Sequence, residues 1–164
     1  MPQNIVRLIQ MNDEAASGVA SDWNHSIGLF ITSFAYVELL VYELFEILPQ
    51  DSLSKSQKNL RDYSERARLL QALIRSTDWH EKKQIEELIE QSLPLATLRN
   101  KLAHNPLYID LYTNGKEIQA RTRIVNAKKR KAMDHITLEQ LHDKLRELSD
   151  LTSELAFQVG FLKG

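Results

Sequence analysis

A run of apolar residues between positions 23 and 48 constrains the fold of this chain most. Its apolar side chains recur at steps of three and four residues, the spacing of one face of an α-helix. They are Trp23, Ile27, Phe30, Ile31, Phe34, Val37, Val41, Leu44, Phe45 and Leu48. The stripe is wide, so we expect the helix to make apolar contacts on more than one side. A chain of 164 residues, 43% of them hydrophobic, can bury such a helix in one domain.

The same run is long enough to raise the question of a membrane span. Glu38, Glu43 and Glu46 lie inside it, and acidic side chains are costly in the middle of a bilayer. We therefore predict a buried core or dimer helix over residues 22–48 and no membrane association. The first residues contain no apolar run sufficient for a signal peptide. The absence of cysteine excludes a disulfide framework, a thiol nucleophile and a Cys-ligated zinc, and a cytoplasmic location is predicted.

Periodicity predicts further helices over residues 54–75, 79–91 and 137–162, in one domain spanning residues 1–164. Residues 1–20 are weakly patterned. The expected capping pairs are Ser54 with Gln57, Asp78 with Glu81 and Thr137 with Gln140. Pro94 either kinks the third helix or opens a new one over residues 94–104. Pro106 disfavours helical geometry at the residue before it, so that helix is expected to end near His104.

A small β-hairpin is predicted over residues 107–125, before the last helix. The segment LYIDLY alternates, Asn114-Gly115 favours a two-residue type I′ turn, and residues 117–125 return. In that register Leu111 pairs with Ile118, and Ile109 pairs with Ala120. The fold class predicted is therefore mainly α, a helical bundle with a hairpin insertion.

Arg99, Asn100 and His104 form the candidate site, on the last turns of a helix. A guanidinium can clamp a phosphate with two parallel hydrogen bonds, and a histidine can exchange a proton near neutral pH. The chain holds two other Arg-x4-His pairs, Arg75/His80 and Arg130/His135, so spacing alone is weak.

The three pairs differ in context. The Arg75/His80 pair crosses the gap between two predicted helices, and the Arg130/His135 pair lies in a basic loop. Helical geometry puts Asn100 and His104 on nearly one face, whereas Arg99 lies about 140° away from His104. A site completed by a second copy of the chain would ease this mismatch.

A structural interpretation of the same residues stays open. In this interpretation the role of Arg99 is to pair with Glu38 and nothing more. His104 interacts with the carbonyls that end its helix, and Asn105 serves as the cap of that helix. The pattern supports no metal site, because the histidines lack paired ligand spacing, and it implies no cofactor.

Charge is unevenly distributed although the net charge is −1. Residues 99–131 hold nine Lys or Arg and two Asp or Glu, a local charge of +7. Such a region can attract a polyanion, or it can be a solvated loop and strand. The candidate RNA-binding residues are Arg121, Arg123, Lys128, Lys129, Arg130 and Lys131.

The motif R-N-x-x-A-H-N-P resembles the signature of the HEPN (higher eukaryotes and prokaryotes nucleotide-binding) family, many of whose members are ribonucleases. The resemblance extends loosely to FAYVELL, around Glu38, and to ERARLLQALI, over residues 65–74. It implies a helical homodimer whose two motifs line one cleft. It also implies metal-free RNA cleavage by attack of the 2′-hydroxyl on the neighbouring phosphate, with Arg99, Asn100 and His104 as catalytic residues.

Toxin members of that family often carry Tyr two residues after His, where this chain has Pro106. This difference puts the corresponding regulation by an antitoxin in doubt, although an antitoxin protein is retained as a candidate partner. The leading prediction is a dimeric, metal-independent endoribonuclease. The alternatives are a non-catalytic HEPN-like dimeric module that binds a nucleotide, RNA or a partner protein, and a purely structural dimer.

Overall fold

Four helices and a small antiparallel sheet form the part of the chain described by the computed structural model. The described residues are 5–6, 14–48, 62–105, 107–113, 118–126 and 131–164. The helices are α1 (Glu14–Ile47), α3 (Tyr63–Arg75), α4 (Lys82–His104) and α5 (Leu138–Lys163). The strands are β1 (Ile5–Val6), β2 (Leu107–Thr113), β3 (Ile118–Asn126) and β4 (Lys131–His135). The protein is thus mainly helical, as the periodicity predicts.

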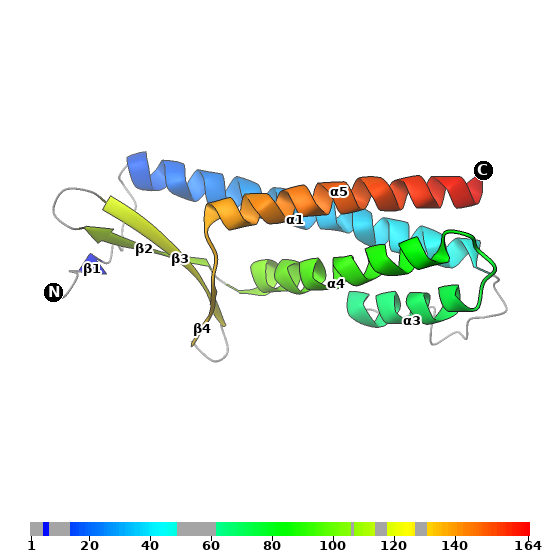
Figure 1. Ribbon diagram of the computed structural model, residues 1–164. Coiled ribbons are helices and arrows are strands. Elements are labelled where there is room, and N and C mark those ends of the chain that lie inside the picture. The colour runs from blue at the N-terminus through cyan, green and yellow to red at the C-terminus, as the bar shows by residue number, and fades with distance from the viewer. Residues whose placement is uncertain (1–4, 7–13, 49–61, 106, 114–117, 127–130) are drawn as a thin grey trace.

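The helices form an elongated bundle. α1 and α5 lie side by side and run in the same direction, α4 packs against both, and α3 packs against α4 at the end away from the sheet (Figure 1). The predicted apolar stripe of α1 supplies much of the core, with Phe30, Phe34, Val37, Val41 and Leu44 fully buried. Residues 21–47 of α1 would also be long and apolar enough to cross a membrane by length and composition alone.

α1 begins eight residues before the predicted start at Asp22. Residues 14–21 contain three alanines but no apolar stripe, so helix propensity favours a helix there whereas periodicity gives no signal. α3 is shorter than the predicted helix over residues 54–75. Asp62 is extended and caps α3, its Oδ1 accepting the Glu65 N–H at 3.1 Å, so no helix runs through this position. The predicted Ser54–Gln57 cap lies outside the described residues.

α4 is one continuous helix that contains Pro94, so the proline does not open a new helix over residues 94–104. Pro94 is exposed, so water can replace the backbone hydrogen bond that proline removes. The predicted Asp78–Glu81 cap is wrong, because the helix starts at Lys82 and Glu81 makes no side-chain cap bond. At the other end α4 stops at His104, as Pro106 predicts.

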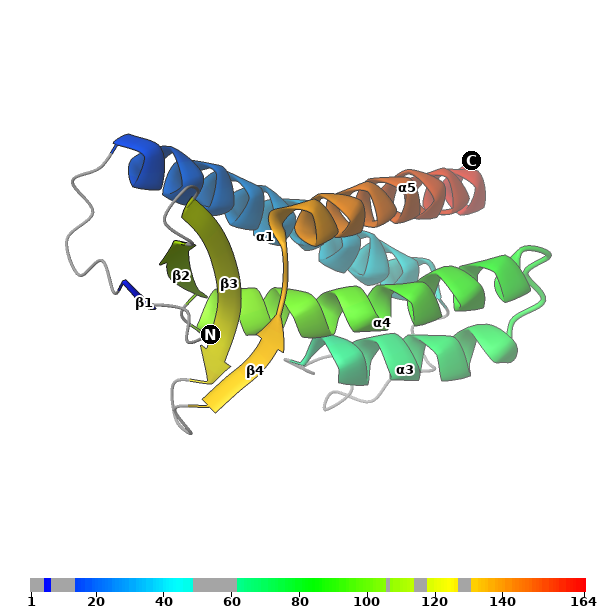
Figure 2. The ribbon, with the colours of Figure 1, turned by 60° about the vertical axis from the view of Figure 1, so that its left-hand side comes forward.

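The sheet has four antiparallel strands in the order β1-β2-β3-β4 and lies where α4 ends and α5 begins (Figure 2). β2 and β3 pair two residues out of the predicted register, with Leu111 opposite Ala120 rather than Ile118. Four residues separate these strands, not two, and these residues, 114–117, lie outside the described part. A shift of two residues keeps every side chain on its face, so alternation cannot distinguish the two registers.

Candidate functional site

The end of α4 presents the motif that the sequence singles out. Asn105 ends the helix in an extended conformation, with φ −128° and ψ 137°. Its backbone N–H and its Nδ2 both donate to the Lys101 carbonyl, at 3.1 and 3.0 Å. Asn105 therefore has the capping role that the structural interpretation gives it.

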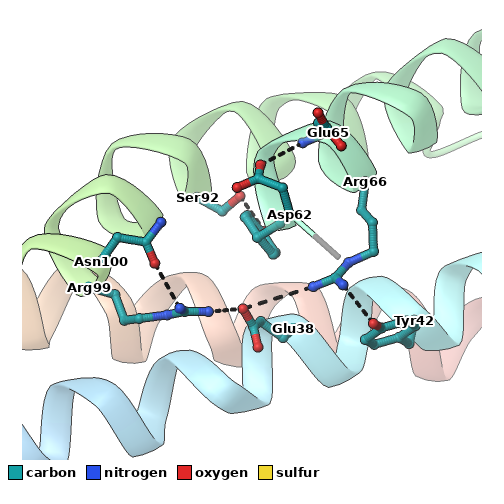
Figure 3. Close-up of polar contacts among 9 residues, drawn as sticks. Glu38, Tyr42, Asp62, Glu65, Arg66, Ser92, Arg99 and Asn100 are labelled. Carbon is teal, nitrogen blue, oxygen red and sulfur yellow. Dashed lines mark hydrogen bonds and ion pairs between the residues drawn. The ribbon is translucent and has the colours of Figure 1, made fainter. Parts of the chain in front are cut away.

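Arg99 is held between two helices. Its Nη2 donates to Oε1 of Glu38 on α1, and its Nη1 donates to Oδ1 of Asn100 at 2.7 Å (Figure 3). The guanidinium carbon lies 5.4 Å from the centre of the Phe34 ring. The Arg99 side chain is 23% exposed, so these contacts fix it with one part still open to solvent. The pairing with Glu38 is the contact that the structural interpretation of Arg99 expects.

Glu38 also faces a second guanidinium, that of Arg66 on α3. Arg66 Nη2 lies 4.0 Å from the same Oε1 oxygen that accepts from Arg99. Arg66 Nη1 donates to the Tyr42 hydroxyl at 2.7 Å, and its guanidinium carbon lies 4.5 Å from the centre of the Tyr42 ring. One carboxylate is thus shared by two arginines from different helices (Figure 3).

Arg66 is not among the site residues predicted from the sequence, although the sequence does contain a signal for it. Arg66 falls on the core face of its helix, three residues after Tyr63 and four before Leu70, and its side chain is only 8% exposed. Charged residues are rarely buried unless they are paired. A basic residue inside an apolar stripe therefore indicates an acidic partner on a neighbouring helix.

A buried hydroxyl pair supports the network from the core side. Ser92 Oγ donates to the Ile89 carbonyl at 2.5 Å, which uses its one hydrogen, so Tyr63 donates to Ser92 across 2.6 Å. The Tyr63 ring meets the Phe34 ring edge to face at 5.0 Å. Burial, with the nearby Glu38 charge as a smaller cause, raises the pKa of Tyr63 to about 12. Phe34 thus lies between this neutral pair and Arg99.

His104 stands apart from this network. It is exposed on the last turn of α4, four residues after Asn100 and on nearly the same helix face. Within the described residues no hydrogen bond or ion pair joins His104 to Arg99 or Asn100. A single chain therefore brings Arg99 and Asn100 together and leaves His104 facing solvent.

The predicted RNA-binding residues lie at or near the sheet. Arg121 and Arg123 are on the central strand β3, opposite Asp110 and Tyr108 of β2. Lys131 is the first residue of β4, which ends at His135, so the basic loop expected for the Arg130/His135 pair is wrong from Lys131 onward. The other three, Lys128, Lys129 and Arg130, lie outside the described residues.

A groove of about 580 Å³ lies between α4 and α5. Leu88, Leu95 and Leu151 are apolar residues that line it, and Glu147, Asp150 and Glu154 are acidic ones. None of the site residues predicted from the sequence lines it. In the described part of the chain, no group of three or more His, Asp or Glu side chains could hold a metal ion.

Comparisons of the chain with protein-family models, curated proteins and solved structures found no match.

Proposed function

We propose that this chain is a metal-independent endoribonuclease of HEPN type, acting as a homodimer at the Arg99 site. The observation that carries the proposal is the end of α4, where a partly exposed Arg99 is oriented by Asn100 and an exposed His104 follows one turn later. These are the groups that phosphodiester cleavage without a metal requires: a fixed cation for the phosphate and a group that exchanges protons near neutral pH.

In the proposed reaction His104 accepts the proton of the ribose 2′-hydroxyl, and the 2′-oxygen attacks the neighbouring phosphorus. The bond to the 5′-oxygen breaks and leaves a 2′,3′-cyclic phosphate, while the His104 of a second copy gives a proton to the leaving oxygen. Such proton transfer contributes roughly 10²–10⁴ in rate. Arg99 stabilises the charge that builds on the phosphate. The basic residues Arg121, Arg123 and Lys131 hold the RNA backbone nearby.

Exposed apolar side chains on α1 support the dimer. Tyr36 and Leu39 are exposed on this helix, and so is Tyr42, whose hydroxyl accepts from Arg66 next to Glu38. A second copy that covers this face would lie beside the site. It could then supply the second His104 that one chain cannot bring to Arg99.

The test is cleavage of a defined RNA in EDTA, with analysis of the product ends for 2′,3′-cyclic phosphate. His104→Ala is expected to lower the rate by at least about a hundredfold while the fold and the dimer persist. Arg99→Ala is expected to abolish cleavage too, and its melting temperature must be measured because it leaves Glu38 without its closest cation.

His80→Ala and His135→Ala are the matched controls, because each histidine also follows an arginine by five positions. His80 lies in the turn between α3 and α4, and His135 ends β4. Both variants should cleave like the unmodified chain. If the purified dimer cleaves none of a set of diverse RNAs, or if all three histidine variants cleave equally, the ribonuclease assignment fails.

The second candidate function is a non-catalytic HEPN-like dimeric module that binds a nucleotide, RNA or a partner protein, an antitoxin among them. The ion pair between Arg99 and Glu38 favours it, because an arginine engaged by a carboxylate has fewer donors left for a phosphate. This module would bind RNA without cutting it, so the same assay separates the two functions.

A further inference from the structure

We propose that Glu38 is a latch that holds Arg99 in the resting site, and that Arg66 compensates the Glu38 charge when Arg99 turns to a phosphate. The inference rests on the proposed function, because it takes Arg99 to be the phosphate-binding group. It assigns a positioning role to Arg66, which lies outside the predicted motif.

The first observation is that the two arginines are unequally engaged. Arg99 makes the close contact with Glu38 Oε1, whereas Arg66 Nη2 lies 4.0 Å from the same oxygen, at the outer limit of an ion pair. Only a small movement of Arg66 would close this gap. Glu38 Oε1 thus has one cation in close contact, Arg99, and a second one, Arg66, at a longer distance.

The second observation is burial. The Glu38 side chain is 25% exposed and that of Arg66 only 8%, so water compensates neither charge fully. Removing the sole partner of a buried charge is strongly unfavourable, because the charge loses its counter-ion without regaining its hydration. If Arg99 were the only cation at Glu38, an anionic ligand would have to overcome this whole cost. Arg66 lowers the cost because it remains beside the carboxylate.

The third observation is what fixes Arg66. The Tyr42 hydroxyl accepts from its Nη1 at 2.7 Å, and the Tyr42 ring lies against the guanidinium at 4.5 Å. Both contacts come from α1, one turn after Glu38. Arg66 is therefore held against the same helix as the carboxylate, independently of Arg99.

The carboxylate of Glu38 and a phosphodiester are similar acceptors for the Arg99 guanidinium. A phosphodiester presents two anionic oxygens to a guanidinium, as a carboxylate does, so Arg99 can leave one acceptor for the other. Asn100 continues to hold the Nη1 group of Arg99 through its hydrogen bond at 2.7 Å. The latch lowers the affinity of the resting site for anions, and a ligand has to displace Glu38 before Arg99 is available.

The test measures binding of a fluorescein-labelled 2′-O-methyl RNA 20-mer of mixed sequence, which lacks the attacking hydroxyl and cannot be cleaved. Glu38→Gln keeps the shape of the side chain and removes its charge. It is expected to tighten binding roughly twofold to fivefold in fluorescence anisotropy, the range for losing one partly exposed ion pair.

Glu43→Gln is the matched control. Glu43 is also on α1, is paired with Lys163 at 3.2 Å, and is similarly buried. This variant makes the same charge change and also releases a cation, but not at the Arg99 site. It should bind the probe like the unmodified chain. If Glu38→Gln tightens binding no more than Glu43→Gln, or weakens it, the latch is wrong.

Substitutions of Arg66 are tested both in the otherwise unmodified chain and in the Glu38→Gln variant. Arg66→Gln should weaken probe binding in the otherwise unmodified chain, because Glu38 then holds Arg99 alone, and Arg66→Lys should restore it. In the Glu38→Gln background, Arg66→Gln should have no further effect. A merely structural role would instead lower affinity and melting temperature alike in both backgrounds. If Arg66→Gln does not fold, Tyr42→Phe, which loosens Arg66 from an exposed position, should weaken binding in the same direction.

Arg99→Gln separates failure of the latch from failure of the proposed site. If it binds the probe as tightly as the unmodified chain, Arg99 is not the phosphate ligand, and both proposals fall. If it loses affinity while Glu38→Gln shows no gain, only the latch falls.

Discussion

Tyr63 illustrates at the residue scale how burial controls an ionisable group. The unfolded chain should lose the hydroxyl proton near the ordinary pKa of 10.0, whereas the folded chain keeps it to about pH 12. Below pH 10 the hydroxyl is neutral in both states, and its contribution to stability is complete. Between pH 10 and 12 only the unfolded state gains by ionising, so the free energy of unfolding falls as the pH rises.

The Tyr63→Phe variant tests this dependence. The loss assigned to Tyr63 is roughly 3 kcal/mol over the whole interval, because one pKa unit is worth about 1.4 kcal/mol. Urea unfolding at several pH values from 9 to 12 should show a steeper decline for the unmodified chain than for the variant. Other titrating groups cancel in this comparison. Parallel curves would mean that the fold does not protect the Tyr63 proton.

The sequence predicts some contacts of the candidate site and not others, and single residues show why. The local motif finds Arg99 and Asn100, because neighbouring positions near a helix end stay close in space. Arg66 contacts Glu38 from 28 positions away, and only helix packing creates that contact. His104 shows the opposite failure, since its proximity in sequence does not bring its ring to Arg99. The pairing of Arg99 with Glu38 is one of the interpretations made from the sequence, whereas the sharing of Glu38 with Arg66 is seen only once the helices are packed.

At the scale of elements, the N-terminus of α5 is set by a local signal. Thr137 Oγ1 accepts the Gln140 N–H at 3.1 Å, and Gln140 Oε1 accepts the Thr137 N–H at 2.8 Å, which is the predicted capping box. Both side chains are exposed, so packing contributes little to this arrangement. Capping boxes of this kind can be predicted because all their atoms lie within four residues.

Thr137→Ala should lower the free energy of unfolding by about 1 kcal/mol, since it leaves a helix-end N–H group without its acceptor. For a chain of this size that corresponds to a melting temperature lower by roughly 2–4 °C. Thr97→Ala is the control. Thr97 is exposed within α4, where its hydroxyl only donates to the Leu93 carbonyl. An equal loss in both variants would indicate a general effect of removing threonine.

The limits of prediction differ between helices and strands. The apolar stripes of α1 and α5 predict their existence, because burying one face repeats a pattern every three or four residues. The pairing of β1 with β2 depends on contacts far apart in the sequence. The boundary at Asp62 has a local cause, the cap bond to Glu65, which the apolar periodicity of residues 54–75 does not reveal. The register of β2 and β3 could not be predicted from the sequence for a simpler reason, because two registers satisfy the same alternation of side chains.

At the scale of the whole molecule, the exposed apolar surface is the feature that the described chain leaves without a partner. Six large apolar side chains are exposed, four on α1 and two on α5, and these helices lie side by side. They are Leu29, Tyr36, Leu39, Tyr42, Phe157 and Phe161. Clusters of this kind mark interaction surfaces. The stripe predicted for α1 is itself covered by the bundle, so the exposed residues form a further apolar surface, which the dimer proposal assigns to a second copy of the chain.

The dimer proposal predicts that a charge placed on this surface separates the two copies. In sedimentation velocity at micromolar concentration, the unmodified chain should sediment as a dimer, and Leu39→Glu and Phe157→Glu should shift it toward monomer, because each buries an unpaired carboxylate in the interface. Ala72→Glu adds the same charge to an exposed position of α3 and should leave the dimer intact. Cleavage should fall together with the dimer, since one chain supplies only one His104. A monomeric unmodified chain would contradict the composite site, and a monomeric variant that still cleaves would show that each chain carries a complete site.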